Sequence, residues 1–336
     1  MPSLKKIYHV ARPVLSLIPV GSFMIGSIMA LFDPFTWSIY KNGSVFTFFA
    51  LSILSLPVFL LSYLSVFFLG VSSSCLNSLV DARDSDLRGF RKDYQNPIVY
   101  YDVSPRQMKI ITVFSAAVSF GIGLYVSLVF AALVLVGNLI SVSYSYYPRM
   151  KRHAPFDVIW NAIGLFTFPF ITGWIVYHSS SQVLLYSLYV NEFSLYLFSG
   201  EGVYYLLAFM LVVRAYWFPF YELLGGSLIG GAFYVITAVL DYDNDKETGI
   251  KTISVILGKR YALLSSLALY TSGVLVMFSH LFFDVGTLLL ASSIAIFIAY
   301  LVIKPENLRL WYLLKLSLMA TLILIAVEII LRVSIH

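Results

Sequence analysis

The sequence predicts an all-α polytopic membrane protein with about nine transmembrane helices around a central cavity. Of its 336 residues, 60% are apolar and 12% are charged, whereas an ordinary soluble domain has about 25% charged residues. Glycine and proline, with 20 and 12 residues, stay far below the roughly 25–30% share that marks low complexity. This composition excludes a soluble globule, a collagen-like chain and a disordered chain.

The transmembrane helices are predicted from long apolar runs. About 18 apolar residues are enough to cross a hydrocarbon layer of roughly 30 Å at ~1.5 Å per residue. Nine such runs occur, at 14–33, 46–76, 108–128, 130–147, 158–178, 216–240, 261–281, 285–303 and 311–333. We expect one domain over residues 1–336. Residues 179–215 contain shorter apolar stretches with charges, which predicts a membrane-lying segment on the outer side.

The basic residues set the predicted orientation. If the N-terminus is cytoplasmic, the loops on that side hold all 22 basic residues except Lys41, Arg214, Lys315 and Arg332. Because Lys and Arg gather in cytoplasmic loops, we expect a cytoplasmic N-terminus and an external C-terminus. The net charge of +5 then reflects orientation in the membrane, and neither a nucleic acid nor an obligate protein partner is indicated.

Cysteine and histidine point to no redox or zinc chemistry. The single cysteine, Cys75, has no second cysteine in the chain with which to form a disulfide. The five histidines are scattered without the spacing of zinc ligands. The chemistry must therefore be sought among other polar residues.

Aspartates cluster in two places. Eight of the eleven fall in two predicted cytoplasmic loops, 77–107 and 241–260, and these are Asp81, Asp84, Asp86, Asp93, Asp102, Asp241, Asp243 and Asp245. One such loop would be explained as a solvated face. The two loops follow the second and the sixth span, which implies a four-helix unit used twice, plus one helix. This arrangement favours a shared site over two ordinary loops.

Helical geometry would group these carboxylates. If the spans continue past the membrane surface, Asn77 and Asp81 stand at i and i+4, as do Asp241 and Asp245. Carboxylates that face one another repel unless cations lie between them. Oxygen-only ligands suit a hard ion such as Mg²⁺, with Mn²⁺ as an alternative, and neighbouring Arg and Lys would bind phosphate.

Several segments together resemble the UbiA superfamily of intramembrane prenyltransferases. Asn77 and Asp81 match its first N-x-x-x-D motif, and Asp241 and Asp245 match its second D-x-x-x-D motif. Three further segments occur in the expected order, at 96–105, 144–151 and 249–258. The last aspartate of the first motif would fall on Ser85, between two aspartates. Asp84 lies about 60° around the helix from Asp81 and Asp86 about 140°, so Asp84 is the expected ligand and Asp86 the alternative.

The resemblance implies Mg²⁺-dependent transfer of a prenyl group from a prenyl diphosphate to a lipophilic or aromatic acceptor, through an allylic carbocation. The prenyl tail would lie in a hydrophobic tunnel open toward membrane lipid. The implied metal ligands are Asp81, Asp84, Asp241 and Asp245. The implied diphosphate-binding residues are Asn77, Arg12, Arg83, Lys151 and Lys251. Asp81, Asp241, Asp245 and Tyr144 are the expected catalytic residues. The acceptor and the length of the prenyl chain are left open.

Two other features bear on this interpretation. Asp157 and Asn161 enter the fifth predicted span at i and i+4, and an acid at a membrane edge is costly enough to suggest a role, although a helix cap is the simpler reading of Asp157. The alternative function is a cation-coupled secondary transporter. Transporters place such carboxylates near the membrane midplane, whereas here they lie at the ends of spans.

Overall fold

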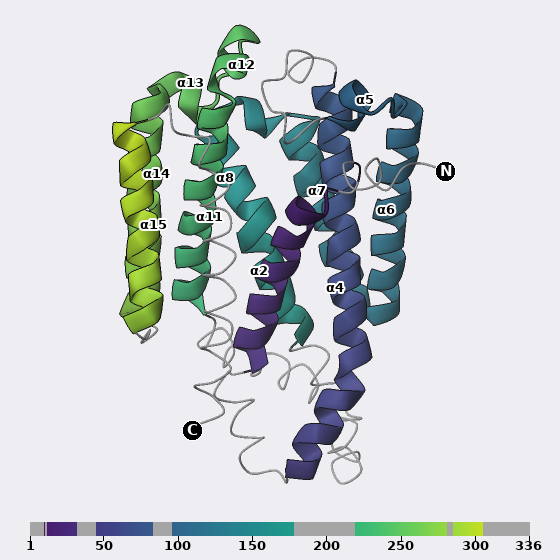
Figure 1. Cartoon of the computed structure of the whole chain (residues 1–336). Coiled ribbons are helices and arrows are strands. Elements are labelled where there is room, and N and C mark those ends of the chain that lie inside the picture. The colour runs from purple at the N-terminus through teal and green to yellow at the C-terminus, as the bar shows by residue number, and fades with distance from the viewer. Residues whose placement is uncertain are drawn as a thin grey trace, which may run out of the picture.

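The computed structural model describes residues 10, 12–31, 45–82, 96–177, 219–280 and 285–304. Within these ranges the regular elements are helices, and the only pairing of β type is an isolated bridge between His153 and Lys251. The all-α prediction is confirmed. The helices run side by side along one direction (Figure 1).

Among the described residues, eight helices that run along the bundle form the body of the protein. The first four are α2 (Pro13–Leu31), α4 (Val45–Asp81), α6 (Pro105–Val126) and α7 (Leu128–Ser145). The other four are α8 (Phe156–Ala162), α11 (Phe220–Leu240), α14 (Lys259–His280) and α15 (Val285–Ile303). From α8 the helix continues through a π-helical turn, η3 (Ile163–Thr167), as far as Tyr177. The short elements are α5 (Pro97–Tyr100), η2 (Met150–Arg152), α12 (Tyr242–Glu247) and α13 (Ile253–Leu257).

These helices match the first eight predicted spans. Among the described residues, six helices are long and apolar enough to cross a membrane, and α2 and α15 supply shorter apolar stretches, Ser16–Ala30 and Ala291–Ile303. The protein is therefore an integral membrane protein. The predicted span at 311–333 and the membrane-lying segment at 179–215 fall outside the described residues.

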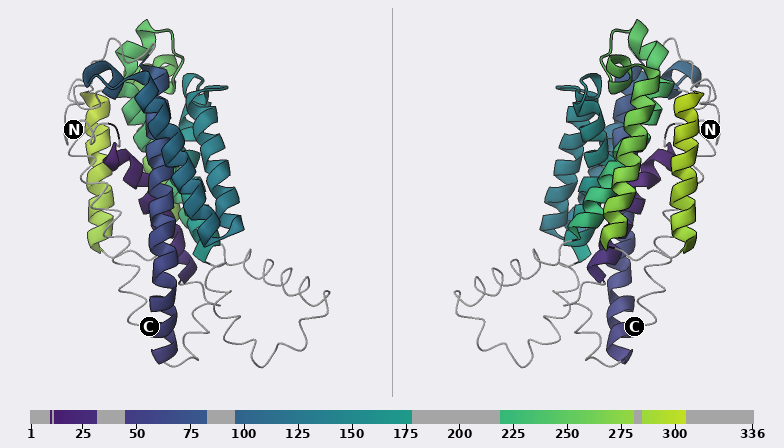
Figure 2. Two further views of the ribbon diagram at one scale, coloured as in Figure 1. Left: turned by 90° about the vertical axis from the view of Figure 1, so that its right-hand side faces the viewer. Right: turned by 90° about the vertical axis from the view of Figure 1, so that its left-hand side faces the viewer.

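The packing repeats between the two halves. In the first half α2 packs on α4, α4 on α6 and α6 on α7, and in the second α8 packs on α11, α11 on α14 and α14 on α15. Figure 2 shows the molecule from two opposite sides, so that the helices of both halves can be followed. At the α11–α14 contact a Cβ on Gly225 would lie 2.8 Å from the carbonyl oxygen of Gly273. Small residues at that crossing allow the close backbone approach common between membrane helices.

The second acidic motif departs from the expected straight helix. α11 ends at Leu240, and Asp241 caps it before α12 begins at Tyr242. The N–H of Asp241 is shared between the carbonyls of Thr237 (3.3 Å) and Ala238 (3.2 Å). Such sharing is typical of a tightened final turn, so the predicted continuous helix is wrong here. The hydrogen bond from the Asp245 N–H to the Asp241 carbonyl (2.8 Å) still keeps the two residues one turn apart.

Candidate active site

Both acidic motifs lie at the same end of the bundle. The end of α4, which carries Asp81, and the short helices α12 and α13 are at the top of Figure 1. The loop between α7 and α8 joins them there. His153 forms a bridge with Lys251, and the Ala154 N–H donates to the Lys251 carbonyl at 3.0 Å. Backbone contacts thus tie the first half of the chain to the segment behind the second motif.

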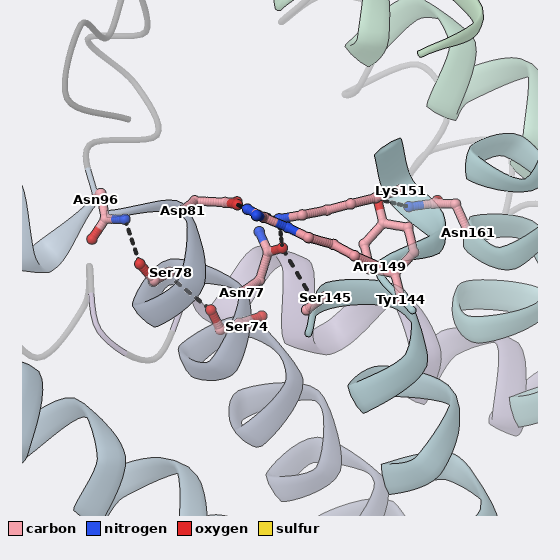
Figure 3. A network of polar contacts seen from close by, with 10 residues as sticks. All are labelled: Ser74, Asn77, Ser78, Asp81, Asn96, Tyr144, Ser145, Arg149, Lys151 and Asn161. Atoms are coloured by element: carbon pink, nitrogen blue, oxygen red, sulfur yellow. Dashed lines mark hydrogen bonds and ion pairs between the residues drawn. The ribbon is translucent and has the colours of Figure 1, made fainter. Parts of the chain in front are cut away.

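The first motif forms a mixed-charge cluster. Asn77 and Asp81 share one face of α4, as predicted, and the Lys151 ammonium donates to the Oδ1 atoms of both, at 2.7 Å to Asn77. A guanidinium nitrogen of Arg149 lies 3.4 Å from Asp81 Oδ1. Ser145 Oγ donates to Asn77 Oδ1 at 3.2 Å (Figure 3). The motif therefore already holds a cation between an amide oxygen and a carboxylate.

The local charge balance of this cluster favours an anion. The side chains of Lys151 and Asp81 are both 12% exposed, and that of Arg149 is 16% exposed. Two cations face one carboxylate, so these three side chains carry a net charge of +1. Electrostatic attraction is strong where little water screens it, and phosphate is well matched to such Arg and Lys side chains.

The backbone turn after α7 places the side chains of Arg149 and Lys151 next to α4. Arg149 has a positive φ of 67° and opens the turn η2. Its N–H donates to the Ser143 carbonyl at 3.0 Å, which folds the chain back over the end of α7. A left-handed conformation costs a non-glycine residue of order 1–3 kcal/mol and persists where the surroundings hold it, often at functional sites. Sequence reasoning did not assign Arg149 to the site, although it lies two residues before Lys151.

In the second motif, Asp245 is buried, whereas the neighbouring Asp243 is exposed. Asp245 is 7% exposed, and its Oδ2 accepts a hydrogen bond from the Thr252 hydroxyl at 3.1 Å. Thr252 and Ser254 are linked at 3.1 Å, and Ser254 donates to the Ala238 carbonyl of α11 at 2.8 Å. Asp243, in contrast, is exposed and pairs with Lys259 at 2.7 Å. The segment 249–252, which follows α12, thus holds Asp245 in place through Thr252, and Asp243 faces solvent.

A third group of polar side chains connects the two halves. Asn161 of α8 donates to the Tyr144 hydroxyl of α7 at 3.2 Å. Asp157, one turn before Asn161, is fully buried, and its Oδ2 accepts from the Ile253 N–H (2.8 Å) and from the Tyr234 hydroxyl (3.4 Å). Sequence reasoning missed Tyr234. Its position two helical turns before Asp241 was the available signal, because residues seven apart share a helix face.

The other predicted site residues lie as follows. Arg12 immediately precedes α2, and the thiol of Cys75, two residues before Asn77, contacts the carbonyl of Val10, two residues before Arg12, at 3.5 Å. The Lys251 side chain is exposed, while its backbone makes the bridge to His153. Arg83 and Asp84 lie outside the described residues. In the part of the chain that the structure describes, no three His, Cys, Asp or Glu side chains converge as a metal site would require.

The fold and the site define a class, an integral membrane protein with acidic and basic side chains gathered at one end of a helical bundle. The model of the UbiA prenyltransferase family matches residues 43–319. The chain belongs to this family, and prenyl transfer is its class of reaction. The comparison with curated proteins gives no match.

Solved structures share the fold. A UbiA homolog from Archaeoglobus fulgidus, bound to DMAPP and Mg²⁺, is 20% identical with a TM-score of 0.58, and the match covers 95% of this chain and 98% of that one. The apo structure of a UbiA homolog from Aeropyrum pernix K1 is 17% identical with a TM-score of 0.61, covering 92% and 97%. A structure described for digeranylgeranylglyceryl phosphate synthase is 14% identical with a TM-score of 0.52, covering 95% and 97%.

Proposed function

We propose that the protein transfers a prenyl group from a prenyl diphosphate to a lipophilic or aromatic acceptor, with Mg²⁺ as cofactor and Mn²⁺ as an alternative. The observation that carries this proposal is the position of Lys151, whose ammonium lies between Asn77 Oδ1 and Asp81 Oδ1. An oxygen pair that accommodates an ammonium also suits a hard metal ion. The UbiA homologs of Archaeoglobus fulgidus bound to DMAPP or GPP with Mg²⁺ support the same cofactor and substrate class.

The donor set fits a magnesium ion. We assign Asp81, Asp241 and Asp245 to the metal, together with Asp84, which lies outside the described residues. All of these are oxygen donors, and Mg²⁺ completes its coordination with water and substrate phosphate. When bound, the ion would offset the negative charge that builds up on the leaving diphosphate.

The basic side chains would bind the diphosphate. Lys151 and Arg149 lie next to Asp81, and a bound metal ion would compete with Lys151 for that carboxylate. Once displaced, the Lys151 ammonium would be free to pair with a phosphate oxygen. We assign the same role to Asn77, Arg12, Arg83 and Lys251, of which Arg83 lies outside the described residues.

The reaction follows from these roles. The C–O bond of the allylic diphosphate breaks, and its electron pair leaves with pyrophosphate, which the cationic side chains stabilise. The resulting allylic cation would lie near Tyr144, and water must be kept away from it until the acceptor reacts. The acceptor atom bonds to the allylic carbon and releases a proton, which the pyrophosphate takes up.

The site would face the cytoplasm. The described basic residues at its end of the bundle include Arg149, Lys151, Lys246 and Lys259, and the positive-inside rule assigns such an end to the cytoplasmic side. We therefore infer a cytoplasmic N-terminus and an external C-terminus for one domain over residues 1–336, with the prenyl tail extending between the helices toward the opposite leaflet.

Turnover by purified protein tests the proposal. The protein in lipid nanodiscs is incubated with labelled geranylgeranyl diphosphate, Mg²⁺ and a panel of hydroxybenzoate-type, naphthoate-type, haem, glyceryl phosphate and carotenoid acceptors. We expect one acceptor class to become prenylated with one pyrophosphate released per product. Excess chelator should stop the reaction, and Mg²⁺ or Mn²⁺ should restore it. Absence of pyrophosphate release from every diphosphate between DMAPP and geranylgeranyl diphosphate would refute the function.

A further inference from the structure

The start of α8 contacts the stretch of chain after α12 at two points. The Ala154 N–H donates to the Lys251 carbonyl at 3.0 Å. Further along, the fully buried Asp157 accepts a hydrogen bond on Oδ2 from the Ile253 N–H at 2.8 Å. The two contacts lie on either side of Thr252, so the backbone of this residue is held from the start of α8 both before and after it.

Thr252 in turn holds Asp245 of the second motif. Its hydroxyl donates to Asp245 Oδ2 at 3.1 Å, and both residues are buried. The backbone of Asp245 is fixed separately, because its N–H donates to the Asp241 carbonyl at 2.8 Å. The carboxylate can still turn, and a hydroxyl holds it only if the backbone that carries the hydroxyl stays in place. The bond between Asp157 and the Ile253 N–H fixes that backbone.

A helix cap does not account for Asp157. The cap residue of α8 is Pro155, and Asp157 lies inside the first turn of the helix. A buried carboxylate is costly unless hydrogen bonds offset the loss of water, and the two bonds that Oδ2 accepts come from other parts of the chain. The Ile253 N–H supplies the shorter one, and the Tyr234 hydroxyl of α11 supplies a longer one at 3.4 Å. Asp157 therefore acts between elements of the fold.

We propose that Asp157 is a positioning residue that orients the Asp245 carboxylate for metal binding. It acts through the Ile253 N–H and the Thr252 hydroxyl. This inference rests on the proposed function, in which Asp245 is a ligand of Mg²⁺, and it adds one residue to that site. The expected effect is on metal affinity, because Mg²⁺ requires near-ideal octahedral geometry. Loss of a partner that orients a metal ligand typically costs about 10–100-fold in metal affinity or activity.

Hydrogen exchange measures the backbone effect directly. The wild type, Asp157→Ala and Asp157→Asn are compared in lipid nanodiscs without metal or substrate, and deuterium uptake is followed in peptides that cover residues 250–257. Asp157→Ala should speed exchange of this segment by about 10-fold, because a buried N–H loses its acceptor. Asp157→Asn keeps an acceptor oxygen and should exchange like the wild type. Unchanged exchange in Asp157→Ala would overturn the inference.

Metal affinity provides the second readout. Binding of Mn²⁺ is measured by electron paramagnetic resonance in the presence of an unreactive thiolo-diphosphate analogue of geranyl diphosphate. We expect Asp157→Ala to weaken Mn²⁺ binding by about 10-fold and Asp157→Asn by less than about 3-fold. The half-activating Mg²⁺ concentration for pyrophosphate release should rise in parallel. Equal loss in these two variants would show that the negative charge is required and not the acceptor bond, which contradicts positioning.

A double-mutant cycle tests whether Asp157 acts through Thr252. Thr252→Val removes the hydroxyl that holds Asp245. In the Thr252→Val background, Asp157→Ala should weaken Mn²⁺ binding by less than about 3-fold further, because the contact it supports is already lost. Losses that multiply to about 100-fold would mean that the two residues act independently, and the inference would then be wrong.

Ile253→Pro removes the same hydrogen bond from its other side. Ile253 is the first residue of α13, where a proline is tolerated because the missing N–H is not needed within the helix. Thr252 has an extended backbone with φ −70° and ψ 165°, which suits a residue before proline. The variant should weaken Mn²⁺ binding about as much as Asp157→Ala. It decides the question if exchange throughout α11 shows that Asp157→Ala is unfolded, and unchanged Mn²⁺ affinity in Ile253→Pro would then overturn the inference.

One control separates positioning from packing, and the wild type separates the inference from the function. Ser266→Ala removes a buried hydroxyl of α14 that donates to the Ala232 carbonyl of α11 at 2.8 Å, and it should leave Mn²⁺ affinity within about 2-fold. If the wild type neither binds the analogue with Mn²⁺ nor releases pyrophosphate, the proposed function itself is wrong. A wild type that turns over, with exchange and Mn²⁺ affinity unchanged in Asp157→Ala, refutes only the inference.

Discussion

Lys151 and Asp81 form an ion pair between the turn after α7 and the end of α4, with both side chains only 12% exposed. The same ammonium contacts Asn77 at 2.7 Å. An acidic motif that would otherwise carry an uncompensated buried charge is thereby neutralised by the protein itself. In the proposed reaction the same lysine would pass from the carboxylate to the diphosphate as metal and substrate bind together.

Replacing Lys151 should therefore strengthen metal binding and weaken diphosphate binding. Lys151→Met keeps the length of the side chain but removes the cation that competes for Asp81. We expect the half-activating Mg²⁺ concentration to fall, while KM for the diphosphate rises by about 10-fold or more, because a charged hydrogen bond to phosphate is lost. Initial rates over a matrix of Mg²⁺ and diphosphate concentrations measure both. Lys151→Arg, which keeps the charge, is the matched control. If the half-activating Mg²⁺ concentration and KM for the diphosphate both rose in Lys151→Met, Lys151 would not compete with the metal ion for Asp81.

The Thr252 hydroxyl should matter through Asp245. Thr252→Val keeps the shape but removes the donor to Asp245 Oδ2, and an unsatisfied buried acceptor costs about 1–3 kcal/mol. We expect kcat/KM to fall by about 10-fold, because 1.4 kcal/mol corresponds to one decade, and the half-activating Mg²⁺ concentration to rise.

Two variants make this result interpretable. Thr252→Ser keeps the hydroxyl and should preserve activity. Thr248→Val removes a hydroxyl that contacts the Asn244 carbonyl of its own helix at 2.8 Å, and should have little effect on kcat/KM. If Thr248→Val were as damaging as Thr252→Val, general disturbance of the α12 region would explain both results.

Much of the fold was predictable from the sequence because long apolar runs have few alternatives in a membrane. The spacing of Asn77 and Asp81 predicted their shared face, since α4 continues to Asp81. The break at Asp241 was not predictable from periodicity, because a tightened final turn leaves the one-turn spacing to Asp245 intact. Helix periodicity places residues on faces, but it does not reveal where the axis changes direction.

The candidate site was predicted in part. Motif resemblance identified Lys151, but its contact with Asp81 depends on the left-handed turn at Arg149, which sequence spacing does not show. Tyr234 lies in an apolar helix where a tyrosine is unremarkable, and its hydrogen bond to Asp157 joins α11 to α8. Contacts between elements far apart in sequence require knowledge of how the helices pack.

Loss of the motif carboxylates should be far more damaging than loss of an exposed one. Asp81→Ala, Asp241→Ala and Asp245→Ala should each lower turnover by about 100-fold or more, the size of effect seen when one electrostatic stabiliser is removed. Asp243→Asn is the control within the same short helix, because Asp243 is exposed and pairs with Lys259. Rates of pyrophosphate release at saturating Mg²⁺ measure the difference. Retained activity in two of the three alanine variants would rule out the assigned metal ligands.

Membrane topology gives an independent test of a shared site. In a Cys75→Ser background, single cysteines replace Tyr147, in the loop after α7, and Glu247, at the end of α12; both positions are exposed. Since backbone contacts between His153 and Lys251 place these loops at one end of the bundle, a membrane-impermeant thiol reagent should label both from the same side. We expect that side to be the cytoplasm, because basic residues gather in cytoplasmic loops. A cysteine at Tyr125, which is exposed near the opposite end of α6, should react only from outside. Labelling of positions 147 and 247 from opposite sides would place the two acidic motifs on different membrane faces, and a single metal–diphosphate site could not then use both.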